Sequence, residues 1–326
     1  METKKLGASG PSLNPLGLGC MSLSGIYGSV PEEAGIKVIH SALDQGINMF
    51  NTGDFYGIGH NELLLGRALK GRRDKAFISV KFGAQRSPDG GWVGFDARPQ
   101  ATKNSLAHSL TRLGVDYVDL YQPARVDPAV PIEETVGAIA EMVKGGYVRH
   151  IGLSEVSPAT LKRAHAVHPI AAVEIEYSLF DREIETELIP TVRELGVAIM
   201  AYGVLSRGMI QSSGQVQVKE NDYRAHLPRF AGENLLHNIQ LVEKLQKLAA
   251  EKNVTATQLA FAWVLSRGND IFALTGSKTV EQLTEIIGAE SVTLSNADIL
   301  LLNEWFPIGV AAGDRYGKPQ MAMLNG

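Results

Sequence analysis

The segment that decides the fold is Phe50-Asn51-Thr52-Gly53-Asp54-Phe55-Tyr56-Gly57. It ends a short apolar run, Ile47-Asn48-Met49-Phe50, which is typical of a buried strand. A polar turn with two glycines follows, and residues 62–70 then have the pattern of a helix. The segment is therefore predicted to be a strand–turn–helix unit, with Tyr56 just beyond the C-terminal end of the strand.

The same alternation of strand and helix repeats along the whole chain. Further strands are predicted at 16–19, 76–80, 117–121, 148–152, 172–175, 197–201 and 271–274. Helices are predicted from residue 31 and at 98–113, 131–145, 157–167, 184–195, 233–252, 256–267 and 279–288. Eight strands, each followed by a helix, predict an α/β fold, a closed (β/α)8 TIM barrel in a single domain spanning residues 1–326. An open doubly wound sheet is the alternative.

Three irregular segments are expected around this barrel. Gly7-Ala8-Ser9-Gly10 predicts the turn of an N-terminal β-hairpin that leads into the first strand. The loops 84–97 and 203–232 are long enough to fold over a ligand, and both belong to the C-terminal face of the barrel. The tail 307–326 is expected to lie across the same face.

Composition excludes several classes of function. The net charge of −4 and the lack of a long Lys/Arg block argue against nucleic acid as the main partner. Cys20 is the single cysteine, so we expect neither a disulfide framework nor a thiolate metal site, and His165-x-x-His168 lacks an acid at metal-binding spacing. No apolar run approaches the ~18 residues of a membrane helix, and the N-terminus lacks the apolar core of a signal peptide. We expect a soluble, cytoplasmic protein without a metal.

Polar residues gather at the predicted C-terminal strand ends, where barrel enzymes keep their chemistry. The residues at these strand ends are Asn51, Lys81, Ala124, Ser154, Glu174 and Tyr202, and all except Ala124 are polar. A lysine beside a tyrosine favours the phenolate, so Tyr56 and Lys81 together would form a proton donor. The alternative is a tyrosine hydroxyl bonded to the backbone and a lysine that reaches solvent.

The order and spacing of several short motifs resemble the aldo-keto reductase superfamily over nearly the whole chain. Among its members, the bacterial and plant reductases and the potassium-channel β-subunit-like proteins are the most similar. The motifs are Leu16-Gly17-Leu18-Gly19, Thr52-x-x-x-Tyr56-Gly57, Asn61-Glu62-Leu63-Leu64-Leu65-Gly66, Val80-Lys81-Phe82-Gly83, Asp119-Leu120-Tyr121, Gly152-Leu153-Ser154-Glu155, Glu176-Tyr177-Ser178-Leu179 and Gly276-Ser277-Lys278-Thr279.

This resemblance implies an oxidoreductase that binds NADP(H) in an extended form. Hydride would pass to a carbonyl carbon while Tyr56 protonates the oxygen and Lys81 tunes the tyrosine. The implied cofactor-binding residues are Met21 and Asn51 near the nicotinamide, Ser154, Glu155 and Glu174 at its carboxamide, Tyr202 under its ring, Gly203, Val204, Leu205, Ser206 and Arg207 along the pyrophosphate, Gly276, Ser277 and Lys278 at the 2′-phosphate, and Gln282 and Glu285 at the adenosine.

The chain departs from the superfamily's catalytic tetrad of Asp, Tyr, Lys and His at two positions. Asn51 stands at the Asp position; it can bond Lys81 but brings no negative charge. Ala124 stands at the His position and can neither orient a carbonyl nor relay a proton. We expect Arg125 not to substitute, because the next residue of a strand points to the opposite face. Glu174 stands where a carboxamide-binding Gln is more usual.

Three hypotheses follow. The first is an NADPH-dependent reductase of a small-molecule aldehyde or ketone, with the preference for NADPH resting mainly on Lys278. The second is an NADPH-binding sensor or interaction module with weak or residual reductase activity, which Asn51 and Ala124 motivate. The third is a barrel isomerase or lyase that uses no nucleotide. Neither the substrate nor the oligomeric state follows from the sequence.

Overall fold

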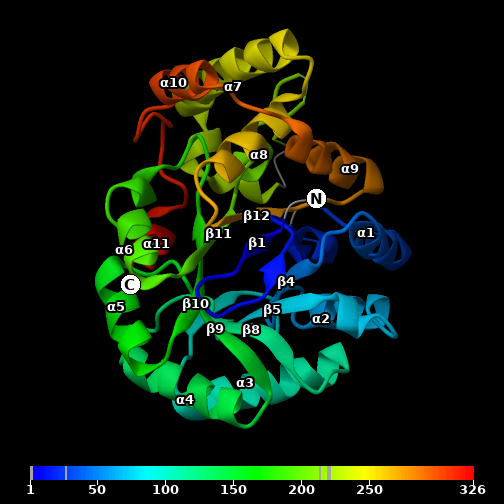
Figure 1. Cartoon of the computed structure of the whole chain (residues 1–326), viewed down its shortest axis with the longest axis vertical. Helices are drawn as coiled ribbons and strands as arrows, with labels where there is room; N and C mark the ends of the chain where they lie inside the picture. Colours follow the sequence, from blue (N-terminus) through cyan, green and yellow to red (C-terminus); the bar gives the residue numbers. More distant parts are fainter. Residues whose placement is uncertain (1–2, 26–27, 213, 219–221) are drawn as a thin grey trace.

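The computed structural model describes residues 3–25, 28–212, 214–218 and 222–326 (Figure 1). Eight parallel strands close into a barrel, which confirms the predicted (β/α)8 TIM fold. In their order around the barrel they are β3 (Leu16–Gly19), β4 (Met49–Gly53), β5 (Phe77–Phe82), β8 (Val118–Pro123), β9 (Val148–Ser154), β10 (Ile170–Glu176), β11 (Ala198–Tyr202) and β12 (Ile271–Thr275).

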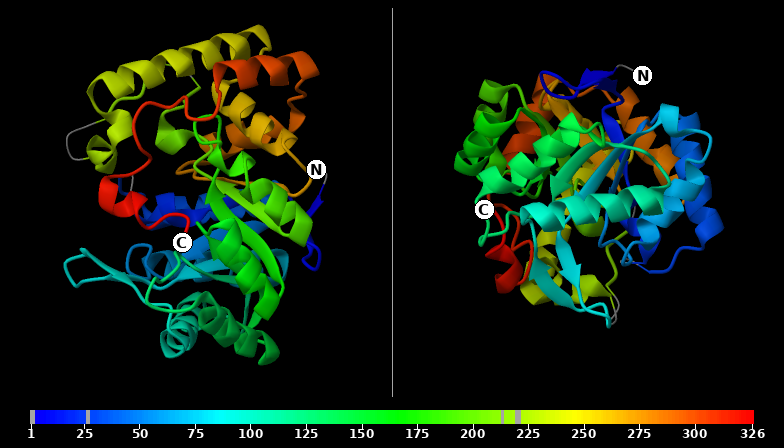
Figure 2. Two further views of the ribbon diagram at one scale, coloured as in Figure 1. Left: turned by 90° about the vertical axis from the view of Figure 1, so that its left-hand side faces the viewer. Right: turned by 90° about the horizontal axis from the view of Figure 1, so that it is seen from below.

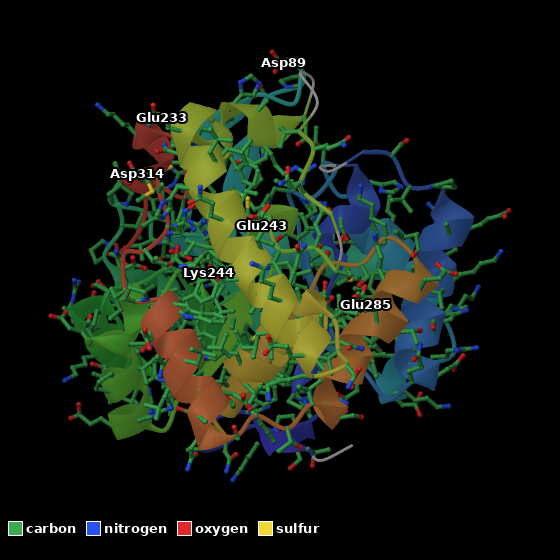
Figure 3. The ribbon with its side chains drawn as sticks, turned by 90° about the horizontal axis from the view of Figure 1, so that it is seen from above. Asp89, Glu233, Glu243, Lys244, Glu285 and Asp314 are labelled. Carbon is green, nitrogen blue, oxygen red and sulfur yellow. The ribbon has the colours of Figure 1, made fainter. Side chains whose placement is uncertain are left out.

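Helices surround the barrel (Figures 1 and 2). They are α1 (Glu32–Asp44), α2 (His60–Ala68), α3 (Pro99–Leu113), α4 (Ile132–Lys144), α5 (Pro158–Val167), α6 (Leu188–Leu195), α7 (Gly232–Glu251), α8 (Ala256–Ser266), α9 (Val280–Ile287), α10 (Asn296–Trp305) and α11 (Lys318–Met321). In α8 a capping box between Thr255 and Gln258 satisfies backbone groups of the first turn. In Figure 3, α7, which carries Glu243 and Lys244, lies beside α10.

The barrel interior is layered because strand side chains alternate between its two faces. Met49, Phe77, Leu120 and other apolar residues form a buried cluster inside the N-terminal half. The predicted N-terminal hairpin, β1 (Lys4–Lys5) paired with β2 (Ser12–Leu13), closes this end and contributes Leu6 and Leu13 to the cluster. One step further along the strands the inward residues become polar, and these form the floor of the site.

The long loops and the tail lie on the C-terminal face, as predicted. Within the loop 84–97, β6 (Ala84–Arg86) and β7 (Trp92–Phe95) form a hairpin that projects from the barrel, with Asp89 near its tip (Figures 2 and 3). In the loop 203–232, residues 213 and 219–221 lie outside the described residues. Among the helices of the described chain, none is both long and apolar enough to cross a membrane.

Gly66 is required by the packing of α2 against α3. A Cβ at this position would lie 2.5 Å from the backbone oxygen of Leu113, which cannot move as a flexible side chain can. Gly137 in α4 is a matched position, because a Cβ there would meet nothing within 4 Å. We expect Gly66→Ala to lower the free energy of unfolding by about 1–3 kcal/mol, and Gly137→Ala to raise it by about 0.5–1 kcal/mol. Urea denaturation checks both values, and equal effects at the two positions would contradict this packing argument.

Candidate active site

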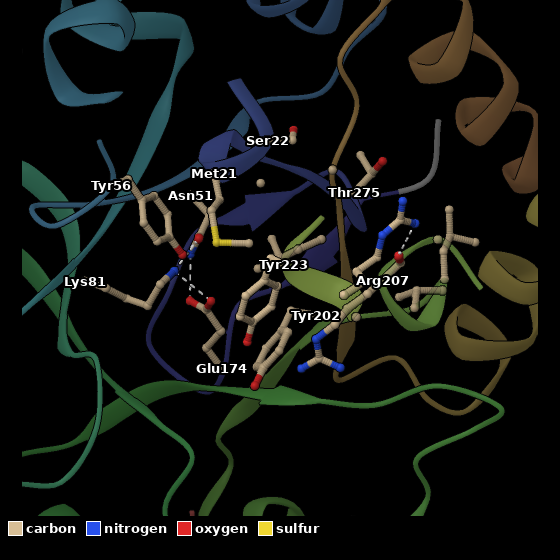
Figure 4. A pocket seen from close by; sticks show the side chains of 18 of the residues that line it. Met21, Ser22, Asn51, Tyr56, Lys81, Glu174, Tyr202, Arg207, Tyr223 and Thr275 are labelled. Atoms are coloured by element: carbon tan, nitrogen blue, oxygen red, sulfur yellow. Dashed lines mark hydrogen bonds and ion pairs between the residues drawn. The ribbon is translucent and has the colours of Figure 1, made fainter. Parts of the chain in front are cut away.

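A cavity of about 790 Å³ opens on the C-terminal face of the barrel. It runs from Tyr56 and Lys81 at one end to Lys278 and Gln282 at the other. Figure 4 shows Tyr56, Lys81 and Glu174 on one side of it, and Arg207 on the other. Strand ends, the loops 84–97 and 203–232 and the tail all contribute to its lining, so segments distant in sequence form one site.

A buried polar cluster forms the floor of the cavity beside Tyr56. Lys81 on β5 and Glu174 on β10 form an ion pair across the barrel, with Nζ 2.7 Å from Oε1. Asn51 on β4 accepts a hydrogen bond from Lys81 through its oxygen and donates through its nitrogen to Glu174 Oε2 at 2.7 Å. All three side chains are at most 4% exposed. The predicted bond between Asn51 and Lys81 is therefore present.

The turn that carries Tyr56 is held by buried hydrogen bonds. The Tyr56 amide donates to the Gly53 oxygen at 3.0 Å, which closes the turn after β4. Asn61 lies at the start of α2, accepts from the Thr52 hydroxyl at 2.7 Å and donates to the Cys20 oxygen at 2.8 Å. These bonds explain why the motif at residues 61–66 begins with an asparagine. The Asn61 amide alone joins the turn to β4 and to the segment after β3.

Lys81 acts on the pKa of Tyr56 in the predicted direction, but burial of the phenol acts against it. Burial raises the pKa of the Tyr56 phenol, and the nearby positive charge of Lys81 opposes that rise. The net direction is nevertheless upward, so burial outweighs the lysine in the absence of a ligand. For Lys81 burial lowers the pKa, but Glu174 and Tyr56 outweigh it and the pKa is raised. Lys81 is therefore a charged lysine near neutral pH, and Tyr56 carries its proton.

The reason for setting Arg125 aside, that its side chain would point to the opposite face, was wrong. Arg125 lines the same cavity as Ala124 and Tyr56. The strand β8 ends at Pro123, so the alternation of strand faces does not extend to residues 124 and 125. Arg125 donates to the Ala124 oxygen at 2.6 Å. A guanidinium is thus present beside the small side chain of Ala124.

Two further groups face the middle of the cavity. The Ser154 hydroxyl is buried and has no hydrogen-bond partner among the residues that the structure describes, although Ser154 lines the cavity. The hydroxyl of Tyr202 donates to Glu155 Oε1 at 2.7 Å and lies 3.2 Å from that of Tyr316. Glu155 also accepts from the Glu176 amide, so it fixes Tyr202 from behind the cavity wall. A buried hydroxyl without a partner is costly and indicates a place for a polar ligand group.

Carboxylates and arginines clamp the tail onto the site. Arg315 of the tail lies 3.4 Å from Glu155, 3.7 Å from Glu176 and 3.3 Å from Asp181. Glu176 also makes two hydrogen bonds with Arg207, at 3.0 and 2.9 Å. Burial raises the pKa of Glu176, but Arg207 and Arg315 outweigh it and the pKa is lowered. This cluster holds the neighbouring Tyr316 in the cavity wall.

The far end of the cavity carries two cations, one of which, Arg224, is paired with Asp222 at 2.6 Å. Lys278 precedes α9, whose N-cap Thr279 accepts from the Gln282 amide at 3.3 Å. Burial lowers the pKa of Lys278, and the nearby charge of Arg224 lowers it further. Arg224 also lines the cavity. Two cations beside a helix N-terminus form a site suited to a phosphate group.

The structure brings most of the sequence-predicted site residues together. Glu155, Ser206 and Ser277 do not line the cavity, whereas the others do: Met21, Asn51, Tyr56, Lys81, Ala124, Ser154, Glu174, Tyr202, Gly203, Val204, Leu205, Arg207, Gly276, Lys278, Gln282 and Glu285. Sequence reasoning directed Arg125 away from the site and missed four residues of the loop 203–232 and the tail: Tyr223, Arg224, Arg315 and Tyr316. The length of the loop and of the tail indicated their involvement, but no pattern singled out these residues.

Comparison with known proteins agrees with this fold. Residues 15–305 match the Aldo/keto reductase family. A probable aldo-keto reductase from Glycine max is 45% identical over 322 residues, which covers 97% of this chain and 92% of that protein. A glycerol dehydrogenase from Gluconobacter oxydans is 27% identical with a TM-score of 0.86, over 93% of this chain and 94% of that one. The fold is also that of an aldo/keto reductase from Klebsiella pneumoniae in complex with NADP and acetate, which is 21% identical with a TM-score of 0.76 over 97% and 99% of the two chains.

The chain therefore belongs to the aldo/keto reductase family. The resemblance that the sequence motifs indicated is confirmed at this level.

Asp54 beside the site gives a prediction for pH dependence. Burial and the nearby charge of Glu62 raise the pKa of Asp54 from 3.8 to about 7. The folded state thus binds the proton more tightly than the unfolded state, so stability falls as pH rises from about 4 to about 7. We expect Asp54→Asn to raise the free energy of unfolding by about 1–2 kcal/mol at pH 8, a value reduced for solvent access, and by less at pH 5.

Thermal or urea unfolding at the two pH values measures this effect. Asp89→Asn, on the exposed hairpin, is the control and is expected to show no gain at pH 8. A gain for Asp54→Asn that is larger at pH 5 than at pH 8 would contradict the assignment.

Proposed function

We propose that the protein is an NADPH-dependent reductase that converts an aldehyde or a ketone to an alcohol. The observation that carries the proposal is the contact between Tyr56 and a buried, charged Lys81 at one end of a cavity that has two cations at its other end. When bound, NADPH would supply the hydride that is added to the carbonyl carbon. The chain itself has to bind the cofactor, position the carbonyl and deliver a proton.

Tyr56 is the proposed proton donor. Tyr56 lines the cavity, and the Lys81 ammonium lies 5.3 Å from the centre of its ring, where the positive charge stabilises the phenolate that remains after the proton has left. Asn51 helps to hold the ammonium group through its oxygen. The guanidinium of Arg125 lies in the same part of the cavity, where it is a hydrogen-bond donor available to the carbonyl oxygen or to another acceptor on the substrate.

The residues present fit the cofactor. The partnerless hydroxyl of Ser154 would bond the nicotinamide carboxamide, and the ring of Tyr202, held by Glu155, would stack on the nicotinamide. Gly203 to Arg207 would follow the pyrophosphate. Lys278, with Gly276 before α9, would hold the 2′-phosphate, and Gln282 and Glu285 would contact the adenosine. Met21 lines the cavity near Tyr56 and would touch the nicotinamide.

The alternative is an NADPH-binding sensor or interaction module with weak or residual reductase activity. Ala124 favours it, because its methyl group lines the cavity and has no polar atom for the carbonyl. A panel of aldehydes, ketones and α-dicarbonyls, assayed by NADPH oxidation at 340 nm, separates the two functions. Turnover supports the reductase, whereas tight NADPH binding without turnover on the whole panel supports the module.

Tyr56→Phe tests the proton donor. It removes the hydroxyl and keeps the ring, so we expect carbonyl reduction to fall by about 10²–10⁴-fold while NADPH still quenches the tryptophan fluorescence with nearly the same Kd. Tyr147→Phe is the matched control, because Tyr147 is 50% exposed and does not line the cavity. Equal turnover of Tyr56→Phe and the wild type would remove Tyr56 from the mechanism.

Lys278→Met tests the phosphate site. A hydrogen bond to a charged group contributes about 1.5–3 kcal/mol, so the Kd for NADPH is expected to rise at least about 10-fold. The Kd for NADH should change little, because NADH lacks the 2′-phosphate. Lys144→Met, at the exposed end of α4, is the control. If the affinities for NADPH and NADH fall equally in Lys278→Met, Lys278 does not bind the 2′-phosphate.

A further inference from the structure

The bonds around Glu174 do not fit a residue that is kept for the cofactor. Glu174 Oε1 accepts from Lys81 at 2.7 Å. Glu174 Oε2 accepts from Asn51 at 2.7 Å and also from Gln122 Nε2. The carboxylate is thus shared among three donors of the chain, and it is only 4% exposed. These contacts leave little capacity to bind a carboxamide.

The charge of Lys81 also argues that Glu174 is not kept for the cofactor. Lys81 is 4% exposed, and a buried ammonium without a counter-charge is strongly unfavourable. Among the described residues, Glu174 is the only carboxylate within ion-pair distance of Lys81. The other polar neighbours, Asn51, Ser79 and Gln122, are uncharged. The charge of Lys81 is therefore compensated from β10 and not from β4, the strand that precedes Tyr56.

Asn51 and Glu174 are chemically complementary. The Asn51 amide donates to the carboxylate and accepts from the ammonium, and both bonds require an amide at position 51. An aspartate there could not donate to Glu174 unless one of the two carboxyls took up a proton. The amide at 51 and the carboxylate at 174 thus form a matched pair.

We infer that Glu174 is the positioning residue of Lys81, supplying from β10 the negative charge that keeps the ammonium group beside Tyr56. The inference rests on the proposed role of Tyr56 and Lys81 in proton donation. It assigns Glu174 to the proton-donating pair and leaves Ser154 as the group for the carboxamide. Asn51 then orients the carboxylate and the lysine but carries no charge.

The first experiment exchanges the two groups. Glu174→Gln removes the carboxylate, and Asn51→Asp places two carboxylates face to face. The double variant Asn51→Asp/Glu174→Gln restores one charge and one amide, and Gln122 can turn its partnerless Oε1 towards the new amide. In Glu174→Gln we expect kcat to fall by about 10²-fold. The double variant should recover to within about 10-fold of the wild type, above both single variants.

The pH profile distinguishes positioning from a purely structural role. Without Glu174, burial lowers the pKa of Lys81, so activity should be lost at a lower pH than in the wild type. The alkaline limb of kcat/KM is therefore expected to move down by at least about one pH unit in Glu174→Gln and to return in the double variant. An unchanged limb and kcat in Glu174→Gln, or a double variant no better than Glu174→Gln, would overturn the inference.

A second experiment needs neither cofactor nor turnover. Melting temperatures are measured for Lys81→Met, Glu174→Gln and their combination. Each single variant leaves one buried charge without its partner, so the combination is expected to melt higher than either. The pKa of Lys81 is raised in the fold, so the stability from the pair is fully present below pH 10.5 and is lost as the pH rises through the higher pKa of the folded state. The deficit of Glu174→Gln should thus be larger at pH 6 than at pH 10.5.

If the losses in melting temperature of Lys81→Met and Glu174→Gln simply add in the combined variant, the two side chains are not coupled and the pairing is overturned. If the wild type turns over no carbonyl but this cycle shows coupling, the proposed reductase function fails while the assignment of Glu174 to Lys81 stands. If turnover is present but coupling is absent, the reductase function stands and the assignment fails.

Discussion

The buried positive charge of Lys81 is the constraint on which the centre of this barrel depends. Removing an ammonium group from water costs several kcal/mol, and the cost is offset only by a close counter-charge and complete hydrogen bonding. The chain meets this requirement with side chains from four strands: Asn51, Ser79, Gln122 and Glu174. A barrel suits this arrangement, because its closed sheet points the inward residues of many strands at one axis.

The rest of the site is arranged at increasing distance from this charge. Tyr56 lies next to the lysine, and its turn is fastened by Asn61. Beyond it the cavity wall changes from strand ends to loops, and the opposite end is formed by Lys278 and Arg224. The strands thus hold Lys81 with its partners and, at Ser154 and Tyr202, the groups proposed for the nicotinamide, while a loop holds the residues proposed for the pyrophosphate. That division is common in barrel enzymes.

Sequence patterns predicted the barrel well because each strand is short, apolar and followed by an amphipathic helix. The same periodicity failed for Arg125, since β8 ends one residue before Ala124 and backbone geometry after a strand is not set by alternation. The partner of Lys81 was also beyond the reach of local patterns. Lys81 and Glu174 are 93 residues apart, and only the closed barrel brings them to 2.7 Å. Arg315 and Tyr316 in the tail have no periodic context, so their position had to come from the structure.

The ion pairs of Arg315 have a consequence for truncation of the chain. Residues 16–275 contain all eight barrel strands, so no residue of the tail belongs to the closed sheet. The carboxylates of Glu155, Glu176 and Asp181 nevertheless share Arg315 as an ion-pair partner. A chain that ended before Arg315 would therefore keep every barrel strand but lose part of the charge compensation behind Tyr202.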